Sequence, residues 1–446
     1  MPLLGILTDP HAEPLERETM RHVTRRLIPL LMICYFVGYL DRVNVSFASL
    51  TMNRDLHLSA AVYGFGGGIF FLGYFLFEIP SNLMLERVGA RRWIARILVT
   101  WGIISACTSL VRGEWSFYGV RFFLGLAEAG FYPGIILYLT WWFPSFYRSR
   151  IIGLFMTAIP ISVVLGSIVS GWILSLDQFG GLAGWQWLFI LEGGPAVILG
   201  VIVYFFLTDQ PEGAHWLIPE QRTWLAKRIA DERAARETVH HYNLGETLRN
   251  GRVWALTLVY FGQNVAGYGL VIFLPQIIKR FGVSDVQTGL INAIPFAFAA
   301  VAMVLWGLHS DRTGERSIHT AIACFVTFVG LAVCVGIDHP FVLMVAIIFS
   351  QMGQSSIAPV FWSLPTAMLS GTAAAGGIAL INAVGNLGGF LGPYAMGLIR
   401  DYTGNFKLGL LAISSGALVA GIVVLALGHD RRLERIKGPA AAKPAE

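Results

Sequence analysis

The stretch Tyr35-Phe36-Val37-Gly38-Tyr39-Leu40-Asp41-Arg42-Val43-Asn44 places an acid beside a base at the end of an apolar run. No charged residue precedes the pair between residues 27 and 40. A helix that begins near residue 27 and rises about 1.5 Å per residue carries Asp41 roughly 20 Å into a hydrocarbon layer about 30 Å thick. An ionisable side chain at that depth costs about 2.5–3.5 kcal/mol, so we expect it to face a partner, a cavity or a substrate.

The composition of the whole chain indicates a polytopic membrane protein. The 446 residues are 55% hydrophobic and 13% charged, whereas soluble chains carry about 25% charged residues. The net charge of +5 does not indicate nucleic-acid binding, because the basic residues lie between apolar runs, as the positive-inside rule expects. The four cysteines lie within apolar runs without CxxC spacing, so we expect neither disulfides nor a metal site.

The apolar segments predict an all-α membrane protein with twelve transmembrane helices in two six-helix halves. Arginine-rich loops on alternate connections place both termini in the cytoplasm. The expected parts are a cytoplasmic N-terminal tail (1–21), an N-terminal half (22–207), a cytoplasmic inter-half loop (208–252), a C-terminal half (253–428) and a cytoplasmic tail (429–446).

A short motif occurs twice, about half the chain apart. Glu86-Arg87-Val88-Gly89 follows the second predicted span, and Asp311-Arg312-Thr313-Gly314 follows the eighth. Parallel six-span repeats are typical of transporters that bind substrate near the midplane between the halves. An acid beside the start of the next helix gains from the helix dipole and from arginine pairing. We therefore expect the acid and arginine of each copy to act in gating.

The fourth predicted span, 116–142, carries a second acid and base. Arg121 and Glu128 are seven residues apart and share one helix face, at a depth similar to that of Asp41 and Arg42. Buried carboxylates can bind and release protons as their partners move, so both acids are candidates for proton coupling. The planar guanidinium binds carboxylates bidentately, so both arginines are candidates for anion binding. The alternative is two buried ion pairs that only fix helix packing.

Neutral polar residues extend this prediction. Tyr39 and Tyr74 lie at a similar depth and either hydrogen-bond a hydroxylated acid or pack at an interface. In the second half, polar residues of three spans either line a substrate cavity or join helices by hydrogen bonds. The candidates for substrate binding there are Gln263, Asn264, Trp362 and Asn382.

Two more acids lie in apolar spans. Glu78 precedes Pro80 near the arginine-rich loop and is expected to pair with those arginines. Glu192, in the sixth span, is expected to cap a neighbouring helix or to bridge the halves. We expect a structural role for both acids. No arrangement of nucleophile, base and acid indicates an enzyme.

Several of these motifs resemble known families. The paired loop motifs, Arg121-x-x-x-Gly125 and the twelve-span layout resemble the major facilitator superfamily. Within it, Tyr39-Leu40-Asp41-Arg42-Val43-Asn44, Arg121…Glu128 and Leu274-Pro275-Gln276-Ile277-Ile278-Lys279 resemble the anion:cation symporter family, which includes phthalate, galactonate and hexuronate permeases. The stretch from Phe361 to Tyr394 is similar to the bacterial tartrate-transporter branch.

The resemblance implies roles for the candidate residues. Asp41 and Glu128 correspond to a coupled protonation pair, and Arg42 and Arg121 to its partners. The positions that match the family's cavity-lining residues are Tyr39, Tyr74, Trp362 and Asn382. Sugar-acid members tend to have hydroxyl groups where this chain has Pro359 and Phe361, which weakens a sugar-acid assignment.

The resulting prediction is proton-coupled symport of a small organic anion, tartrate or a related hydroxy-dicarboxylate, by alternating access. We expect a monomer surrounded by lipid in the bacterial inner membrane, with the proton as coupling ion and no other cofactor. The alternatives are uptake of an aromatic or sugar acid by the same mechanism, and an anion uniporter or exchanger without proton coupling.

Overall fold

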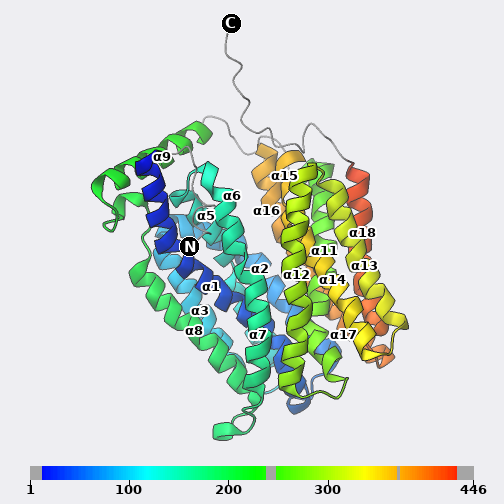
Figure 1. The fold of residues 1–446 in the computed structure, drawn as a ribbon. Helices are drawn as coiled ribbons and strands as arrows, with labels where there is room; N and C mark the ends of the chain where they lie inside the picture. The colour runs from blue at the N-terminus through cyan, green and yellow to red at the C-terminus, as the bar shows by residue number, and fades with distance from the viewer. Residues whose placement is uncertain (1–12, 238–247, 369–371, 429–446) are drawn as a thin grey trace. The chain divides into compact units, whose positions relative to one another are not determined.

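The structure is a computed structural model that describes residues 13–237, 248–368 and 372–428 (Figure 1). The described residues are helical and contain no strand. The helices of the first part are α1 Pro14–Asp55, α2 Ala60–Val88, α3 Ala90–Cys107, α4 Glu114–Glu128, α5 Phe131–Trp142, α6 Ser145–Met156, α7 Ala158–Leu174, α8 Gly184–Phe206 and α9 Pro219–Glu237. Those that follow are α11 Gly251–Lys279, α12 Asp285–Thr313, α13 Ser317–Val333, α14 Pro340–Phe361, α15 Ser363–Met368, α16 Thr372–Asn386, α17 Gly388–Thr403 and α18 Lys407–Leu427.

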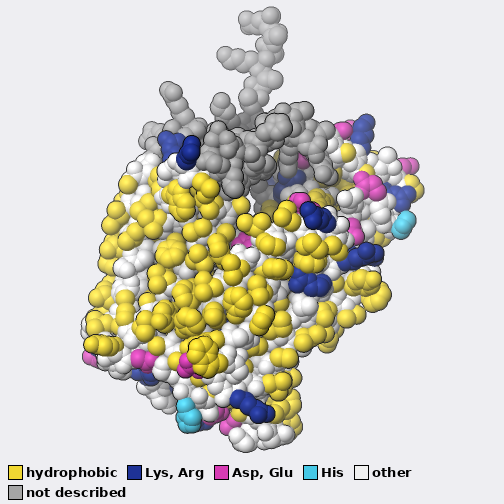
Figure 2. Space-filling model, turned by 180° about the vertical axis from the view of Figure 1, so that it is seen from behind, with side chains coloured by type: hydrophobic (Ala, Val, Ile, Leu, Met, Phe, Trp, Pro, Cys, Tyr) yellow, Lys and Arg dark blue, Asp and Glu magenta, His cyan; other side chains and the backbone are white. Residues whose placement is uncertain are grey.

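Eleven helical stretches in the described part are long and apolar enough to cross a membrane. The remaining predicted span, 374–399, is formed by α16 and α17, which are separated at Leu387. Hydrophobic side chains cover most of the described surface drawn in Figure 2, as expected for helices that face lipid. The all-α, twelve-span prediction is therefore confirmed.

The chain divides into two compact units. Unit 1 comprises Met1–His240, Val271–Ile294 and Pro393–Gly404, and unit 2 comprises His241–Leu270, Pro295–Gly392 and Asn405–Glu446. Within unit 1, α8 packs along α3 and also against α1, and these three helices lie side by side in Figure 1. Within unit 2, α13 packs against α14 and α18.

Glycines let α2 and α4 approach each other closely within unit 1. A Cβ atom at Gly73 would lie 2.3 Å from the Phe122 carbonyl oxygen, and one at Gly125 would lie 2.0 Å from the Phe70 carbonyl oxygen. Neither position can hold a side chain, so the two backbones are in direct contact, as is common between transmembrane helices. This crossing brings the polar face of α4 close to α1.

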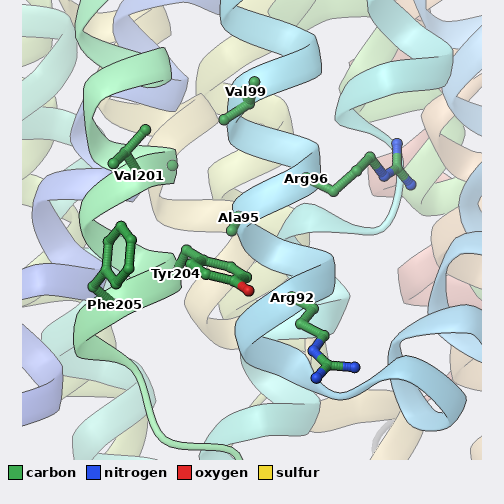
Figure 3. Close-up of a pocket in the computed structure, with 8 residues that line it drawn as sticks. Arg92, Ala95, Arg96, Val99, Val201, Tyr204 and Phe205 are labelled. Atoms are coloured by element: carbon green, nitrogen blue, oxygen red, sulfur yellow. The ribbon is translucent and has the colours of Figure 1, made fainter.

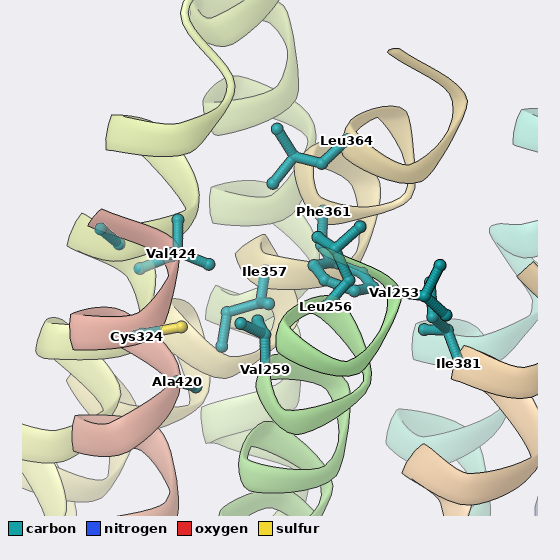
Figure 4. Close-up of a cluster of buried hydrophobic side chains, with 12 residues drawn as sticks. Val253, Leu256, Val259, Cys324, Ile357, Phe361, Leu364, Ile381, Ala420 and Val424 are labelled. Atoms are coloured by element: carbon teal, nitrogen blue, oxygen red, sulfur yellow. The ribbon is translucent and has the colours of Figure 1, made fainter. Parts of the chain in front are cut away.

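Unit 2 has an apolar core of its own. Side chains from α11 and α14, among them Leu256, Ile357 and Phe361, meet there and are fully buried (Figure 4). Trp362 packs against the same cluster. The thiol of Cys324 is buried in it, and all four cysteines of the chain are free.

Candidate functional site

Asp41 is buried on α1 and is held by neutral donors. Its side chain is 1% exposed. It accepts hydrogen bonds from the Trp101 indole (2.5 Å), the Asn44 amide (2.8 Å) and the Ser105 hydroxyl. No ion pair joins it to the described residues, although its charge interacts with that of Arg121. The carboxylate is therefore fixed in orientation without a cation in contact.

Arg42, the next residue, forms an ion pair with Glu128. Its guanidinium also lies over three aromatic rings, 5.3 Å from the centroid of Tyr39, 5.5 Å from Phe70 and 5.7 Å from Tyr74. We call these rings the aromatic cage. The second carboxylate oxygen of Glu128 is buried without a hydrogen-bond partner. The pair is thus enclosed by apolar surface, where its electrostatic attraction is strong.

A break in the fourth span positions Glu128. The sequence predicts one continuous helix over 116–142, but α4 ends at Glu128 and α5 begins at Phe131. Gly130 has a φ of 84°, and a Cβ atom there would lie 2.2 Å from the Ser81 hydroxyl. Only glycine meets both conditions, so the helix is interrupted here. Glu128 consequently lies at a helix end.

Among the charged groups of the site, Arg121 has the fewest hydrogen-bond and ion-pair partners. Its side chain is 2% exposed, and it makes no hydrogen bond or ion pair with the described residues. It lies 5.2 Å from the Phe70 ring centroid and interacts electrostatically with Asp41 and Glu128. A buried guanidinium without contacting acceptors is costly, so this position favours an incoming anion.

Two contacts of Asp41 lie on a helix to which the sequence analysis gave no functional residue. Trp101 and Ser105 are four residues apart on α3 and both donate to Asp41. Their i, i+4 spacing puts them on one helix face. A serine and a tryptophan on one face of an apolar span indicate hydrogen-bond donors that need a buried acceptor, so the sequence did contain a signal for these contacts. Asn44, three residues after Asp41 on α1, was another.

The polar residues predicted in unit 2 largely pair with one another. The Gln263 amide donates to Asn264 (2.8 Å), and Asn264 donates to the Gly385 carbonyl oxygen (3.0 Å). Gln354 donates to the Gln263 side chain at 3.1 Å and to its backbone oxygen at 2.9 Å. We call these residues the amide cluster. They join α11, α14 and α16 by neutral hydrogen bonds.

The remaining two candidates of unit 2 lie elsewhere in that unit. Trp362 is in edge-to-face contact with Tyr260, with ring centroids 4.9 Å apart. Asn382 is half-buried on α16. The Trp362 ring thus packs on the apolar core of unit 2, whereas Gln263 and Asn264 belong to the amide cluster.

The predicted gating residues differ in their contacts. Asp311 forms an ion pair with Arg316 at 2.6 Å, whereas Arg312 is exposed. Glu86 and Arg87 are exposed and form no ion pair with the described residues.

In unit 1, the start of α3 is held by an acid that the motif does not contain. The Asp209 carboxylate accepts the Arg91 backbone N–H at 2.8 Å. A Cβ atom at Gly89, whose φ is 94°, would lie 2.9 Å from that carboxylate. An acid after α8 therefore occupies the helix N-terminus for which Glu86 was the sequence candidate.

A cavity of about 350 Å³ lies between α3 and α8, away from these charges. Its lining includes Ala95, Val99 and Tyr204, and the Arg92 and Arg96 guanidinium groups extend away from the apolar side chains of α8 (Figure 3). Phe205, on its rim, is 79% exposed. The lining of this cavity contains none of the predicted site residues. Within the described part, no group of three His, Cys, Asp or Glu residues could hold a metal ion.

Comparison with known proteins identifies the family. The model of the Major Facilitator Superfamily matches residues 31–393 and, in a second match, 278–445. The chain belongs to this superfamily. It is a multi-pass membrane transporter and not an enzyme.

Individual relatives agree with this assignment. An Agrobacterium vitis protein with the provisional name of tartrate transporter is 53% identical over 87% of this chain and 86% of its own. The quinolone resistance transporter of Acinetobacter baumannii is 40% identical over 85% and 87%. The inward-facing, unoccupied structure of a bacterial homologue of the human lysosomal transporter Spinster has a TM-score of 0.74, with 17% identity over 96% of this chain and 100% of that one. The predicted resemblance to tartrate transporters is confirmed.

Proposed function

We propose that the chain is a proton-coupled symporter of a small organic anion. The observation that carries the proposal is Arg121, a buried guanidinium without a contacting acceptor, beside a buried acid and a buried ion pair. In this arrangement the binding of a negatively charged ligand and the binding of a proton can each change the affinity of the site for the other. The six-helix halves 22–207 and 253–428, the bacterial inner membrane and cytoplasmic termini are part of the proposal.

The ion pair between Arg42 and Glu128 supplies the coupling step. When Glu128 is ionised, it holds the Arg42 guanidinium. Protonation of Glu128 removes that attraction and leaves Arg42 available to a ligand carboxylate, together with Arg121. Loss of the proton restores the pair, and the ligand then competes with Glu128 for Arg42. Proton binding thus favours anion binding, and proton release favours anion release.

Asp41 links protonation to helix packing. Its ionised carboxylate is the acceptor for donors on α1 and α3. Protonation converts one oxygen from an acceptor to a donor, so at least one of these contacts must change. Because Asp41 and Arg121 also interact electrostatically, neutralising Asp41 leaves the Arg121 charge less compensated and strengthens its attraction for an anion.

A hydroxy-dicarboxylate such as tartrate is the favoured substrate. Two guanidinium groups suit two carboxylates, and two rings of the aromatic cage beside Arg42 are tyrosines, Tyr39 and Tyr74. The similarity to a protein provisionally named tartrate transporter supports this choice. The cage itself favours a second candidate, an aromatic acid whose ring stacks on the half-buried Tyr39. The substrate roles of Trp362, Asn382, Gln263 and Asn264, and the gating roles of Glu86, Arg87, Asp311 and Arg312, stay predictions.

The test is uptake into liposomes that contain the purified protein. Labelled tartrate, an aromatic acid and a sugar acid are offered with and without an inward proton gradient. We expect accumulation of tartrate only with the gradient, and loss of accumulation in Asp41→Asn and Glu128→Gln with retained exchange of labelled for unlabelled substrate. Uptake that does not depend on the gradient would show a uniporter or exchanger instead.

A further inference from the structure

Glu192 on α8 is a buried acid to which the coupling scheme above assigns no role. It is 1% exposed, and one of its carboxylate oxygens accepts the Ser170 hydroxyl of α7 at 2.7 Å. The other oxygen is buried and has no hydrogen-bond partner. No Lys, Arg or His among the described residues forms an ion pair with it. The sequence suggested a helix cap or a bridge between halves, but a single neutral donor is a poor partner for a structural anion.

Three of the buried acids of unit 1, Asp41, Glu128 and Glu192, differ in what stabilises a negative charge. Glu128 contacts a guanidinium, and Asp41 accepts three donors. Glu192 has one hydroxyl. An ionised carboxylate in such a site costs several kcal/mol, and a group in that position becomes neutral instead. Glu192 is therefore the acid of the three best suited to hold a proton.

The helices around Glu192 connect it to Asp41. Helix α8 packs against α1, α3 and α7. The next residue, Gly193, lies against α3, where a Cβ atom would be 3.1 Å from the Ser105 Cβ. Ser105 itself donates to Asp41. The charged or polar groups that these helices present are Asp41 on α1, Ser105 on α3 and Ser170 on α7, and Asp41 interacts electrostatically with Glu192.

We propose that Glu192 is a further proton carrier beside Asp41 and Glu128, which exchanges a proton with Asp41 during the transport cycle. When Asp41 is ionised, its negative charge keeps Glu192 protonated. When Asp41 is neutral, that repulsion is absent and Glu192 can release its proton. The proton moves between two carboxyl groups, so each transfer leaves the total charge of the pair unchanged. The inference rests on the proposed proton coupling and adds one proton site to it.

Glu192→Gln separates this role from a structural one. Glutamine has nearly the shape of a protonated glutamate and can still accept the Ser170 hydroxyl. If Glu192 were permanently neutral, the substitution would leave transport unchanged. If Glu192 holds the proton that Asp41 gives up, the variant loses this exchange partner, so gradient-driven uptake slows and its pH dependence shifts, while the number of protons moved per tartrate stays the same. Glu192→Asp retains an ionisable group and is expected to retain the wild-type pH dependence.

An infrared measurement tests Glu192 without transport. The carbonyl-stretching band of a protonated buried carboxyl group is expected in the wild-type protein at neutral pH, with loss at high pH and absence in Glu192→Gln. Identical bands in wild type and Glu192→Gln, or an unchanged rate and pH dependence of uptake in the variant, would overturn the inference. If wild-type uptake ignores the proton gradient, proton-coupled symport fails. The infrared band then still decides whether Glu192 holds and releases a proton.

Discussion

The buried polar groups of the two units differ in kind. In unit 1 they are charged and incompletely satisfied, with Arg121 lacking a contacting acceptor and Glu128 keeping one buried oxygen without a partner. In unit 2 the amide cluster is neutral and mostly paired within itself, although Gln351 and Gln354 each keep a buried oxygen without a partner. Charges respond strongly to protons and anions, whereas paired amides mainly hold helices together. The difference supports the proposal that the coupling chemistry lies in unit 1.

The largest effect is expected from Arg121→Ala. Loss of charge-assisted hydrogen bonds worth about 1.5–3 kcal/mol predicts tartrate binding weaker by about 10- to 150-fold, measured by calorimetry at fixed pH. The thermal stability of the empty protein should not fall, because a buried cation without a contacting acceptor has been removed. Arg121→Lys keeps the charge but not the planar fork, and is expected to bind with intermediate affinity. Unchanged tartrate affinity in Arg121→Ala would show that the anion does not bind at Arg121.

The next effect concerns the pair of Arg42 and Glu128. Each single change to alanine leaves the other charge buried without its partner, so both are expected to lower the free energy of unfolding. The double variant should lose less than the sum, with a coupling energy of about 1–3 kcal/mol. Thermal unfolding in detergent of wild type, both single variants and the double variant gives this value. Strictly additive losses would mean that the two side chains do not act as a pair.

The sequence predicted which charges meet, but not how they pair. Counting helical rise from the membrane edge puts Asp41, Arg42, Arg121 and Glu128 at similar depths, and the structure brings their helices together. Depth does not give the facing direction of each side chain. The pairing depends on the break at Gly130, and the close approach of Ser81 to this glycine is a tertiary contact that the sequence does not show.

Contacts between residues distant in the sequence were the other part that could not be predicted. Trp101 and Ser105 reach Asp41 from α3, about 60 residues further along the chain. Asp209 caps the start of α3 from the segment after α8. Neither contact produces a local pattern of hydrophobic periodicity or charge in the sequence, because both depend on how α3 packs against α1 and α8. The all-helical fold, in contrast, follows from the apolar runs alone.

A smaller effect is expected in the amide cluster. Asn264→Ala removes the donor to the Gly385 carbonyl oxygen and the acceptor of the Gln263 amide N–H, at a cost of about 1–3 kcal/mol in the free energy of unfolding. The pH dependence of uptake should be unchanged, since no titrating group is involved. Asn264→Asp is the informative companion, because it introduces a charge into this neutral cluster and should destabilise the protein more than alanine does. A shift in the pH dependence of uptake in Asn264→Ala would show that unit 2 contributes to proton coupling.

The smallest effect is expected where unit 2 has a charged pair near the surface. The Asp311 side chain is 64% exposed, so its ion pair with Arg316 is screened by water and salt. Asp311→Asn should change the free energy of unfolding by at most about 1 kcal/mol, with the difference from wild type shrinking as salt is added. Arg316 keeps the Ser310 hydroxyl as a partner at 3.0 Å. If Asp311→Asn lowered the free energy of unfolding as much as Glu128→Ala, solvent exposure would not explain the difference between the charged pairs of the two units. Changed uptake rates at unchanged stability would instead support the predicted role of Asp311 in gating.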